Sequence, residues 1–104
     1  MMEWTAEKWE EEEIQKDPVF LYLYTPLCGT CMVASKMLTI IETMKPEMKI
    51  GKMDLNYSKE LAEKYEVESV PCLLVVEESI LKDKVYRFES VPHLLEVCNR
   101  YISI

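Results

Sequence analysis

Two cysteines separated by two residues stand where an apolar run gives way to a helical pattern, and this junction constrains the fold most. The apolar run covers residues 19–24, and the cysteines are Cys28 and Cys31, with Gly29 and Thr30 between them. The spacing places the two sulfurs one helical turn apart, close enough to form a disulfide. Because a helix N-terminus favours negative charge, it lowers the pKa of a thiol placed there, and the thiolate is the reactive form in disulfide exchange. The motif therefore indicates a redox pair, although cysteine spacing alone is a weak signal.

Hydrophobic patterns along the rest of the chain predict alternating helices and strands. We expect helices at about 5–16, 30–45, 56–65 and 90–102, and strands at about 19–25, 48–55, 70–76 and 84–89, the last an edge strand. This order predicts an α/β fold with a central, partly parallel sheet of four strands, with five strands as the alternative, and helices on both faces. At 104 residues the chain is long enough for one domain, which we expect to span 1–104.

The apolar positions of two helices predict how these helices pack. The helix at 30–45 carries two apolar stripes, which predict close packing against the sheet. The stripes are Cys31, Ala34, Leu38 and Ile41, and Val33, Met37, Ile40 and Met44. In the first helix, Trp9 and Ile14 are the expected anchors. The four glutamates at 10–13 are expected to form a solvated helix face, with a partner-docking patch as the alternative.

Charge and composition exclude several classes of function. A net charge of −7, from 12 basic and 19 acidic residues, makes nucleic acid and anionic membrane surfaces unfavourable partners. The N-terminal residues show no secretory signal, and no apolar stretch approaches the ~20 residues needed to span a membrane. We therefore expect a cytoplasmic protein, whose four cysteines are thiols, catalysts or metal ligands rather than structural disulfides. No coiled-coil pattern is present, and we expect a monomer.

Taken together, these features resemble the thioredoxin family. The buried strand leads directly into the cysteine motif, and the order of elements fits over about residues 6–104, as in a compact member that begins at the first helix without the family's leading strand. Val70 and Pro71 stand at the head of a later strand, where the family has a cis-proline, and Lys52 precedes that proline by nineteen residues, matching a family lysine. The resemblance implies a thioredoxin-like fold, thiol–disulfide exchange with protein disulfides and a role in cell redox homeostasis. It implies no metal and no cofactor other than a redox-active disulfide, with a disulfide reductase or a small thiol as electron donor.

The resemblance also implies roles for individual residues. Cys28 would attack a substrate disulfide as a thiolate, and Cys31 would resolve the mixed disulfide. Pro71 would be cis and pack against the sulfur pair, while the backbone of Val70 would pair with an extended substrate segment. Leu27 stands where the family usually has tryptophan, and it leaves an apolar lip at the substrate surface.

The dipeptide between the cysteines departs from the usual Gly-Pro of the family. Here it is Gly29 and Thr30. Without the proline, a backbone N–H becomes free to point at the Cys28 sulfur. Because a further hydrogen bond to the thiolate stabilises the reduced form, we expect a weaker reductant than members with Gly-Pro.

Two further departures concern the surroundings of the pair. Tyr22 occupies the position where family members bury an aspartate that handles the proton of the second cysteine. A tyrosine, with a reference pKa near 10, is a poor base at neutral pH. We therefore expect proton removal from Cys31 to be slower, or to use water or Lys52. A family glycine near the substrate groove is also missing, and Glu89 or a neighbour takes its place.

The remaining cysteines and the single histidine have simpler interpretations. Cys72 follows the proline and is expected to be a small core residue, with a third exchanging thiol at the substrate site as the alternative. Cys98 lies in an apolar helical stripe and is expected in the core. His93, in the first turn of the last helix, is expected at the surface and makes no catalytic dyad with the motif.

Three functions therefore compete. The first is a thiol–disulfide oxidoreductase that reduces protein disulfides through Cys28 and Cys31. The second is a thioredoxin-like binding or adaptor module with slow or no redox turnover, which the altered surroundings of the pair make credible. The third is a metal site with Cys72 as a third ligand, which lacks the second cysteine pair typical of structural zinc.

Overall fold

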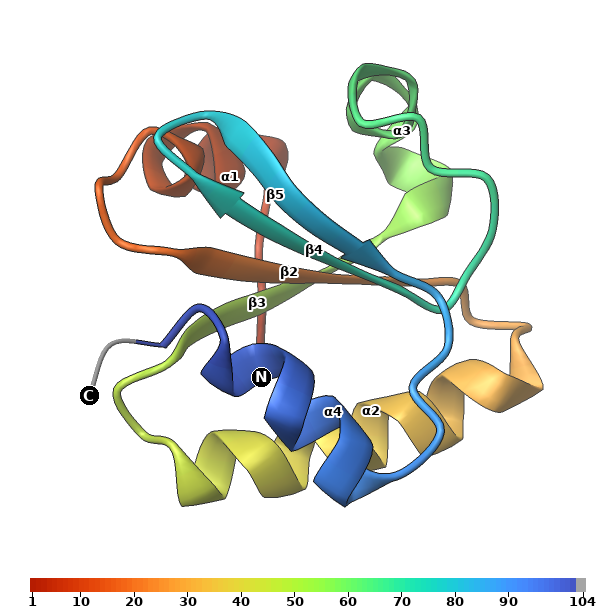
Figure 1. Cartoon of the computed structure of the whole chain (residues 1–104). Helices are drawn as coiled ribbons and strands as arrows, with labels where there is room; N and C mark the ends of the chain where they lie inside the picture. The colour runs from red at the N-terminus through yellow and green to blue at the C-terminus, as the bar shows by residue number, and fades with distance from the viewer. Residues whose placement is uncertain (103–104) are drawn as a thin grey trace.

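A five-stranded mixed sheet lies between two layers of helices in the computed structural model, which describes residues 1–102 (Figure 1). The strands are Met2–Glu3 (β1), Val19–Tyr24 (β2), Lys49–Asp54 (β3), Cys72–Glu77 (β4) and Ile80–Val85 (β5). The helices are Ala6–Glu13 (α1), Gly29–Met44 (α2), Lys59–Lys64 (α3) and Val91–Asn99 (α4), with a 3-10 turn, η1, at Leu55–Tyr57. The predicted α/β architecture is confirmed.

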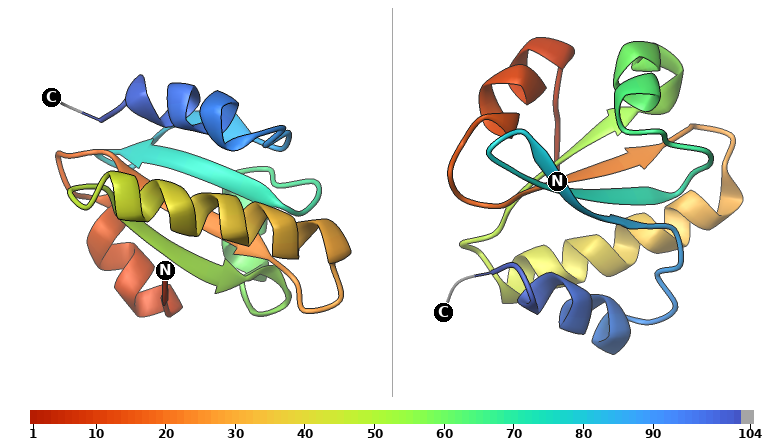
Figure 2. Two further views of the ribbon diagram at one scale, coloured as in Figure 1. Left: turned by 90° about the horizontal axis from the view of Figure 1, so that it is seen from below. Right: turned by 45° about the horizontal axis from the view of Figure 1, so that its top comes forward.

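The sheet has the order β1-β3-β2-β4-β5. β3 runs parallel to β1 and β2, whereas β4 runs antiparallel to both β2 and β5. Helices α2 and α4 cover one face of the sheet, and α1 and α3 cover the other (Figures 1 and 2). β2 therefore lies in the centre, covered on both faces, and its residues Val19–Leu23 are almost wholly buried, as their unbroken apolar run predicts.

The short strand β1 settles the number of strands as five. Met2 and Glu3 pair with Gly51 and Lys52 of β3. The expectation that the chain lacks a leading strand is wrong. The sequence does not reveal β1, because two residues are too few to show the alternation of apolar and polar side chains that is typical of a strand. Next to β1, the ring of Trp4 lies so close to Gly51 that a Cβ atom there would meet it at 1.9 Å. Glycine at position 51 is what permits this close packing.

The edge strand lies earlier in the chain than the sequence predicts. Strand β5 covers Ile80–Val85, whereas the predicted edge strand covers 84–89. It follows β4 through a two-residue turn at Glu78 and Ser79, whose φ angles are 50° and 64°. Such turns usually contain glycine or asparagine, so this one carries no recognisable signal. The alternation after Val85 reflects instead an irregular segment that inserts the buried Phe88 into the core.

Only one of the two apolar stripes on α2 faces the sheet. The first stripe is buried as predicted. The second is not: Val33, Ile40 and Met44 are 55%, 50% and 52% exposed, and only Met37 packs partly against the core. The second stripe lies about 110° around the helix from the first, outside the arc that rests on the sheet.

Helix α1 differs from its prediction in two respects. It ends at Glu13, and Ile14 is 64% exposed rather than an anchor, whereas Trp9 is buried as predicted. The four glutamates do not form one solvated face, because Glu12 and Glu13 are buried. Glu12 pairs with Lys8 and Lys49, and Glu13 binds Lys64 and the hydroxyl group of Tyr65.

Candidate functional site

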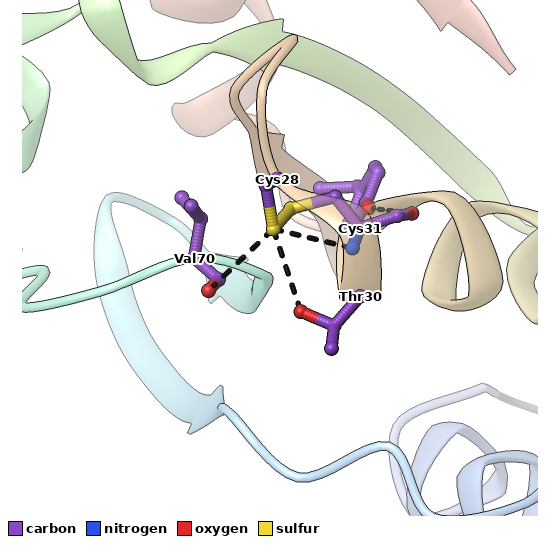
Figure 3. The surroundings of a disulfide bond; sticks show 5 residues. Cys28, Thr30, Cys31 and Val70 are labelled. Carbon is purple, nitrogen blue, oxygen red and sulfur yellow. Dashed lines mark hydrogen bonds between the residues drawn. A yellow bond between two sulfur atoms is a disulfide. The ribbon is translucent and has the colours of Figure 1, made fainter.

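The cysteine pair lies at the end of β2, where the chain turns into α2. Cys28 is the N-cap residue of α2, and the backbone N–H of Cys31 donates a hydrogen bond to its sulfur over 3.2 Å (Figure 3). The two cysteines are joined by a disulfide, with their Cα atoms 5.2 Å apart. The junction predicted from the sequence is therefore present, and a negative charge that develops on Cys28 faces the positive end of the helix dipole.

The two sulfurs differ in their access to solvent. Cys31 is 4% exposed, inside the first turn of α2, whereas Cys28 is only partly buried. Leu27, directly before it, is 99% exposed. An incoming disulfide can therefore reach Cys28 before Cys31.

Thr30 contacts the Cys28 sulfur in a way that the sequence does not predict. Its hydroxyl oxygen lies 3.4 Å from Cys28 Sγ (Figure 3). Within residues 1–102, the backbone N–H that donates to this sulfur is that of Cys31, not that of Thr30 as expected. Replacing proline with threonine thus supplies a side-chain hydroxyl beside the sulfur rather than a backbone donor. Gly29 opens the helix with no side chain near it.

Tyr22 lies directly behind the pair. Its hydroxyl group donates a 2.6 Å hydrogen bond to the carbonyl oxygen of Cys31, and its ring is stacked with that of Tyr24. Burial raises the pKa of Tyr22 to about 12. The hydroxyl therefore stays protonated at neutral pH and cannot act as the base for Cys31.

Lys52 of β3 is the cross-strand partner of Tyr22 of β2, and the two side chains face the same side of the sheet. Its Nζ atom lies 5.6 Å from the centre of the Tyr24 ring. Lys52 and both cysteines line one pocket of about 360 Å³. The structure thus places the predicted lysine in the same pocket as the two sulfurs.

The loop before β4 closes the opposite side of the disulfide. The peptide bond between Val70 and Pro71 is cis, as the resemblance implies. The carbonyl oxygen of Val70 lies 4.0 Å from Cys28 Sγ (Figure 3). These two residues therefore stand beside the accessible sulfur, with a backbone carbonyl directed toward it.

The other two cysteines are buried and apart from the pair. Cys72 is fully buried in the core on the α1 and α3 face of the sheet, whereas α2 covers the opposite face. Burial raises the pKa of Cys72 to about 12 and that of Cys98 to about 11. The core interpretation holds for both, and the third-thiol alternative for Cys72 finds no support. Among residues 1–102, no group of three metal-ligating side chains is present.

Glu89 and His93 pair with each other at the start of α4. His93 Nε2 lies 3.0 Å from Glu89 Oε2, and both side chains are well exposed. Glu89 has a φ of 58°, a left-handed conformation that favours glycine. The structure thus puts a charged side chain at a glycine-like position, while His93 is at the surface as predicted.

Two features of the site escape the sequence analysis. One is the Thr30 hydroxyl beside the sulfur. The other is a hydrogen bond of 2.6 Å from the hydroxyl group of Tyr24 to Glu3, which ties β2 to β1. The alternation of β2 puts Tyr22 and Tyr24 on the same face, but the position of Glu3 depends on a strand too short to recognise.

Comparison with known proteins decides the family. The thioredoxin family profile matches residues 1–97. The chain belongs to the thioredoxin family. The thioredoxin-like protein YusE of Bacillus subtilis is 42% identical over 94 residues, covering 90% of this chain and 89% of YusE. Thioredoxin of the same organism is 30% identical over 91 residues, covering 86% and 88%.

Solved structures show the same fold. A mutant thioredoxin from Halobacterium salinarum superimposes with a TM-score of 0.82 at 19% identity, covering 100% of this chain and 91% of that one. Thioredoxin from Trypanosoma brucei brucei gives the same TM-score at 15% identity, covering 96% and 88%.

Family membership and the Cys28–Cys31 disulfide together define the activity. This thioredoxin-family protein is a thiol–disulfide oxidoreductase of the protein-disulfide reductase type. The adaptor and metal-site alternatives are not favoured. Within residues 1–102, no helix combines the length and apolar character needed to cross a bilayer.

Proposed function

We propose that this thioredoxin-family protein reduces protein disulfides, with Cys28 as the attacking thiolate and Cys31 as the resolving thiol. The observation that carries the assignment is the difference between the two sulfurs. The Cys28 sulfur caps α2, accepts a hydrogen bond from the N–H of Cys31 and is only partly buried, whereas Cys31 is buried. A thiolate is stabilised at a helix N-terminus, so the accessible cysteine is also the one held in reactive form.

The reduction proceeds in two exchange steps. The Cys28 thiolate attacks one sulfur of the substrate disulfide, that disulfide breaks, and the other substrate sulfur leaves as a thiolate. Cys31 then loses its proton and attacks the Cys28 sulfur, which releases the second substrate sulfur and closes the Cys28–Cys31 disulfide. Two electrons pass from the protein to the substrate. The proton of Cys31 passes to solvent, because Tyr22 holds its own proton and cannot accept it.

We infer that the substrate lies across the loop before β4 and the lip of the motif. Leu27 offers an exposed apolar side chain on one side of Cys28, and Val70 offers a backbone carbonyl beside Cys28 Sγ. An extended segment that hydrogen-bonds to the Val70 backbone would present its sulfur to Cys28. Pro71 keeps this loop against the pair, and the fully buried Cys72 side chain takes no direct part.

The remaining assignments follow from the family. We propose a single domain over residues 1–104, a monomer in the cytoplasm, and a disulfide reductase or a small thiol as the electron donor. The family match over residues 1–97 and the nearly full-length match to two Bacillus subtilis proteins support them.

Trapping of the intermediate tests the roles of the two cysteines. In the presence of a protein disulfide such as that of insulin, Cys31→Ser should accumulate a mixed disulfide through Cys28, because no thiol resolves it. Cys28→Ser should form none and should lose reductase activity. Cys98→Ala, which removes a thiol remote from the site, serves as the control and should keep activity. Trapping through Cys31 in the Cys28→Ser variant would reverse the assignment.

A further inference from the structure

The pocket beside the disulfide has the size of a small-molecule site. It measures about 360 Å³ and is formed by β2, β3 and the start of α2. Its walls include both cysteines, the ring of Tyr24, Met32, Lys36 and Lys52. Sites for small molecules span roughly 300–1,000 Å³, so this pocket has the volume to hold a compact molecule. Any ligand held here touches the redox pair.

The pocket is cationic although the chain is strongly acidic. Of the residues that the structure describes, Lys36 and Lys52 are the only charged ones that line it, in a chain with a net charge of −7. Among residues 1–102, neither ammonium group has a carboxylate oxygen within 4.0 Å. The carboxylate of Glu3, on the strand next to Lys52, accepts the hydrogen bond from Tyr24 and does not line the pocket. In the described part of the chain, neither lysine is therefore held in a direct ion pair, although burial and the charges of Glu3 and Asp54 raise the pKa of the neighbouring Tyr24.

We propose that this pocket binds low-molecular-weight thiols and disulfides that carry carboxylates. The carboxylates would lie at Lys36 and Lys52, the methylene chain along Met32, and the sulfur against the cysteine pair. The inference rests on the proposed function and deepens it, because it names the chemical class of the small thiol that exchanges with the pair. Opposite charges at short range supply the attraction, and the partly enclosed site reduces solvent screening.

The exchange with such a disulfide, written RSSR, balances in two steps. The Cys28 thiolate attacks one sulfur of RSSR, the S–S bond breaks, and one RS⁻ leaves. The Cys31 thiolate then attacks Cys28 Sγ of the mixed disulfide and releases the second RS⁻. The protein loses two electrons and RSSR gains them, while the protons of the two cysteines pass to solvent or to the released thiolates. The reverse sequence, with two RS⁻ as reductants, regenerates the dithiol.

Three small disulfides of different charge test the proposal. The reduced protein is mixed with 3,3′-dithiodipropionate, with neutral 2-hydroxyethyl disulfide or with dicationic cystamine, and formation of the Cys28–Cys31 disulfide is timed. Each rate constant is divided by that of the same reagent with dithiothreitol, which removes intrinsic reactivity. The net charge of −7 alone favours the cation. The pocket predicts the opposite order, with the dianion fastest and cystamine slowest.

Variants that remove one lysine at a time show which charges cause the preference for the anionic disulfide. Lys36→Gln and Lys52→Gln should each lower the ratio of the anionic to the neutral rate by roughly threefold, the size expected for one partly exposed ion pair. Lys45→Gln is the matched control, since it changes the net charge equally. Lys45 is the C-cap residue of α2 and lies about 13 Å along the helix axis from Lys36, beyond the screening length near 8 Å. It should leave the ratio unchanged.

The possible outcomes distinguish failure of the pocket proposal from failure of the proposed redox function. Exchange with all three reagents in the order set by net charge, or an equal effect of Lys45→Gln, would overturn the pocket while leaving the redox function intact. Exchange with none of the reagents would overturn the proposed function and the pocket with it.

Discussion

The hydroxyl group of Tyr22 donates a 2.6 Å hydrogen bond to the carbonyl oxygen of Cys31, which joins the central strand to the first turn of α2. Tyr22 is almost wholly buried, and burial raises its pKa to about 12. Where the family resemblance implies a carboxyl group that accepts a proton, this chain places a hydroxyl group that keeps its proton and donates a hydrogen bond. Tyr22 therefore positions the resolving cysteine and does not deprotonate it.

Removing this hydroxyl should cost stability. We expect Tyr22→Phe to lower the free energy of unfolding by about 1 kcal/mol, because a buried hydrogen bond is lost while the ring keeps its packing. Urea denaturation of the oxidised protein measures the change. Tyr57→Phe is the matched control, because Tyr57 is highly exposed and should change stability very little. Equal effects of the two substitutions would show that the Tyr22 hydrogen bond contributes nothing.

The Thr30 hydroxyl should promote the reactivity of Cys28. It lies 3.4 Å from Cys28 Sγ and can donate to the thiolate. We expect Thr30→Val to slow alkylation of Cys28 at pH 7 by about threefold to fivefold, the equivalent of one modest hydrogen bond. Thr30→Ser keeps the hydroxyl and should stay near the wild-type rate. Iodoacetamide labelling followed by mass spectrometry gives both rates, and identical rates for Val and Ser would exclude a contribution from the hydroxyl.

The redox pair could be predicted because its signal is local. The buried run of β2, the two cysteines and the start of α2 are consecutive, so one stretch of sequence contains the strand, the cap and the helix dipole. The greater access of Cys28 also follows from its place at the helix end. The pocket could not be predicted in this way, because Lys52 reaches it from β3 and Lys36 from the second turn of α2.

The error at the edge strand has a local cause, and the error on α2 has a tertiary one. Glu78 and Ser79 adopt positive φ angles, although neither is a residue type typical of such turns, so the sequence does not predict the hairpin turn. On α2, Ile40 is as apolar as Ile41, yet only Ile41 is buried. Which apolar flank of a helix is covered depends on where the sheet and α4 lie, and periodicity alone does not contain that information.

The ion pairs of Glu12 should stabilise the protein at neutral pH and not in acid. Burial works to raise the pKa of Glu12, but hydrogen bonds and charges of Lys8 and Lys49 outweigh it, so the pKa is lowered. The unfolded chain then binds the proton more readily than the folded one. The stabilisation by ionised Glu12 is therefore complete above the pKa of the unfolded chain, near 4.3, and is lost as the pH falls through the lower pKa of the folded protein.

Glu12→Gln tests this pH dependence. We expect it to lower the free energy of unfolding by about 1 kcal/mol at pH 7, with the difference from wild type shrinking as the pH falls below 4. Glu11→Gln, an exposed change in the same acidic run, is the control and should have little effect at either pH. Thermal unfolding across pH 3–7 follows both variants. If Glu12→Gln lowers the free energy of unfolding as much at pH 3 as at pH 7, the loss comes from altered packing and not from the charge of Glu12.

Truncation should destabilise the buried flank of α2 much more than the exposed flank. Leu38 is fully buried between α2 and the sheet, so Leu38→Ala should lower the free energy of unfolding by about 2–5 kcal/mol through lost burial and a cavity. Ile40, half exposed on the second stripe, should tolerate Ile40→Ala with a loss of about 1 kcal/mol or less. Guanidinium denaturation of both variants in dilute solution measures the two losses. If Ile40→Ala proves as costly as Leu38→Ala, the second stripe must be covered in solution, because only a buried side chain leaves a cavity when it is truncated.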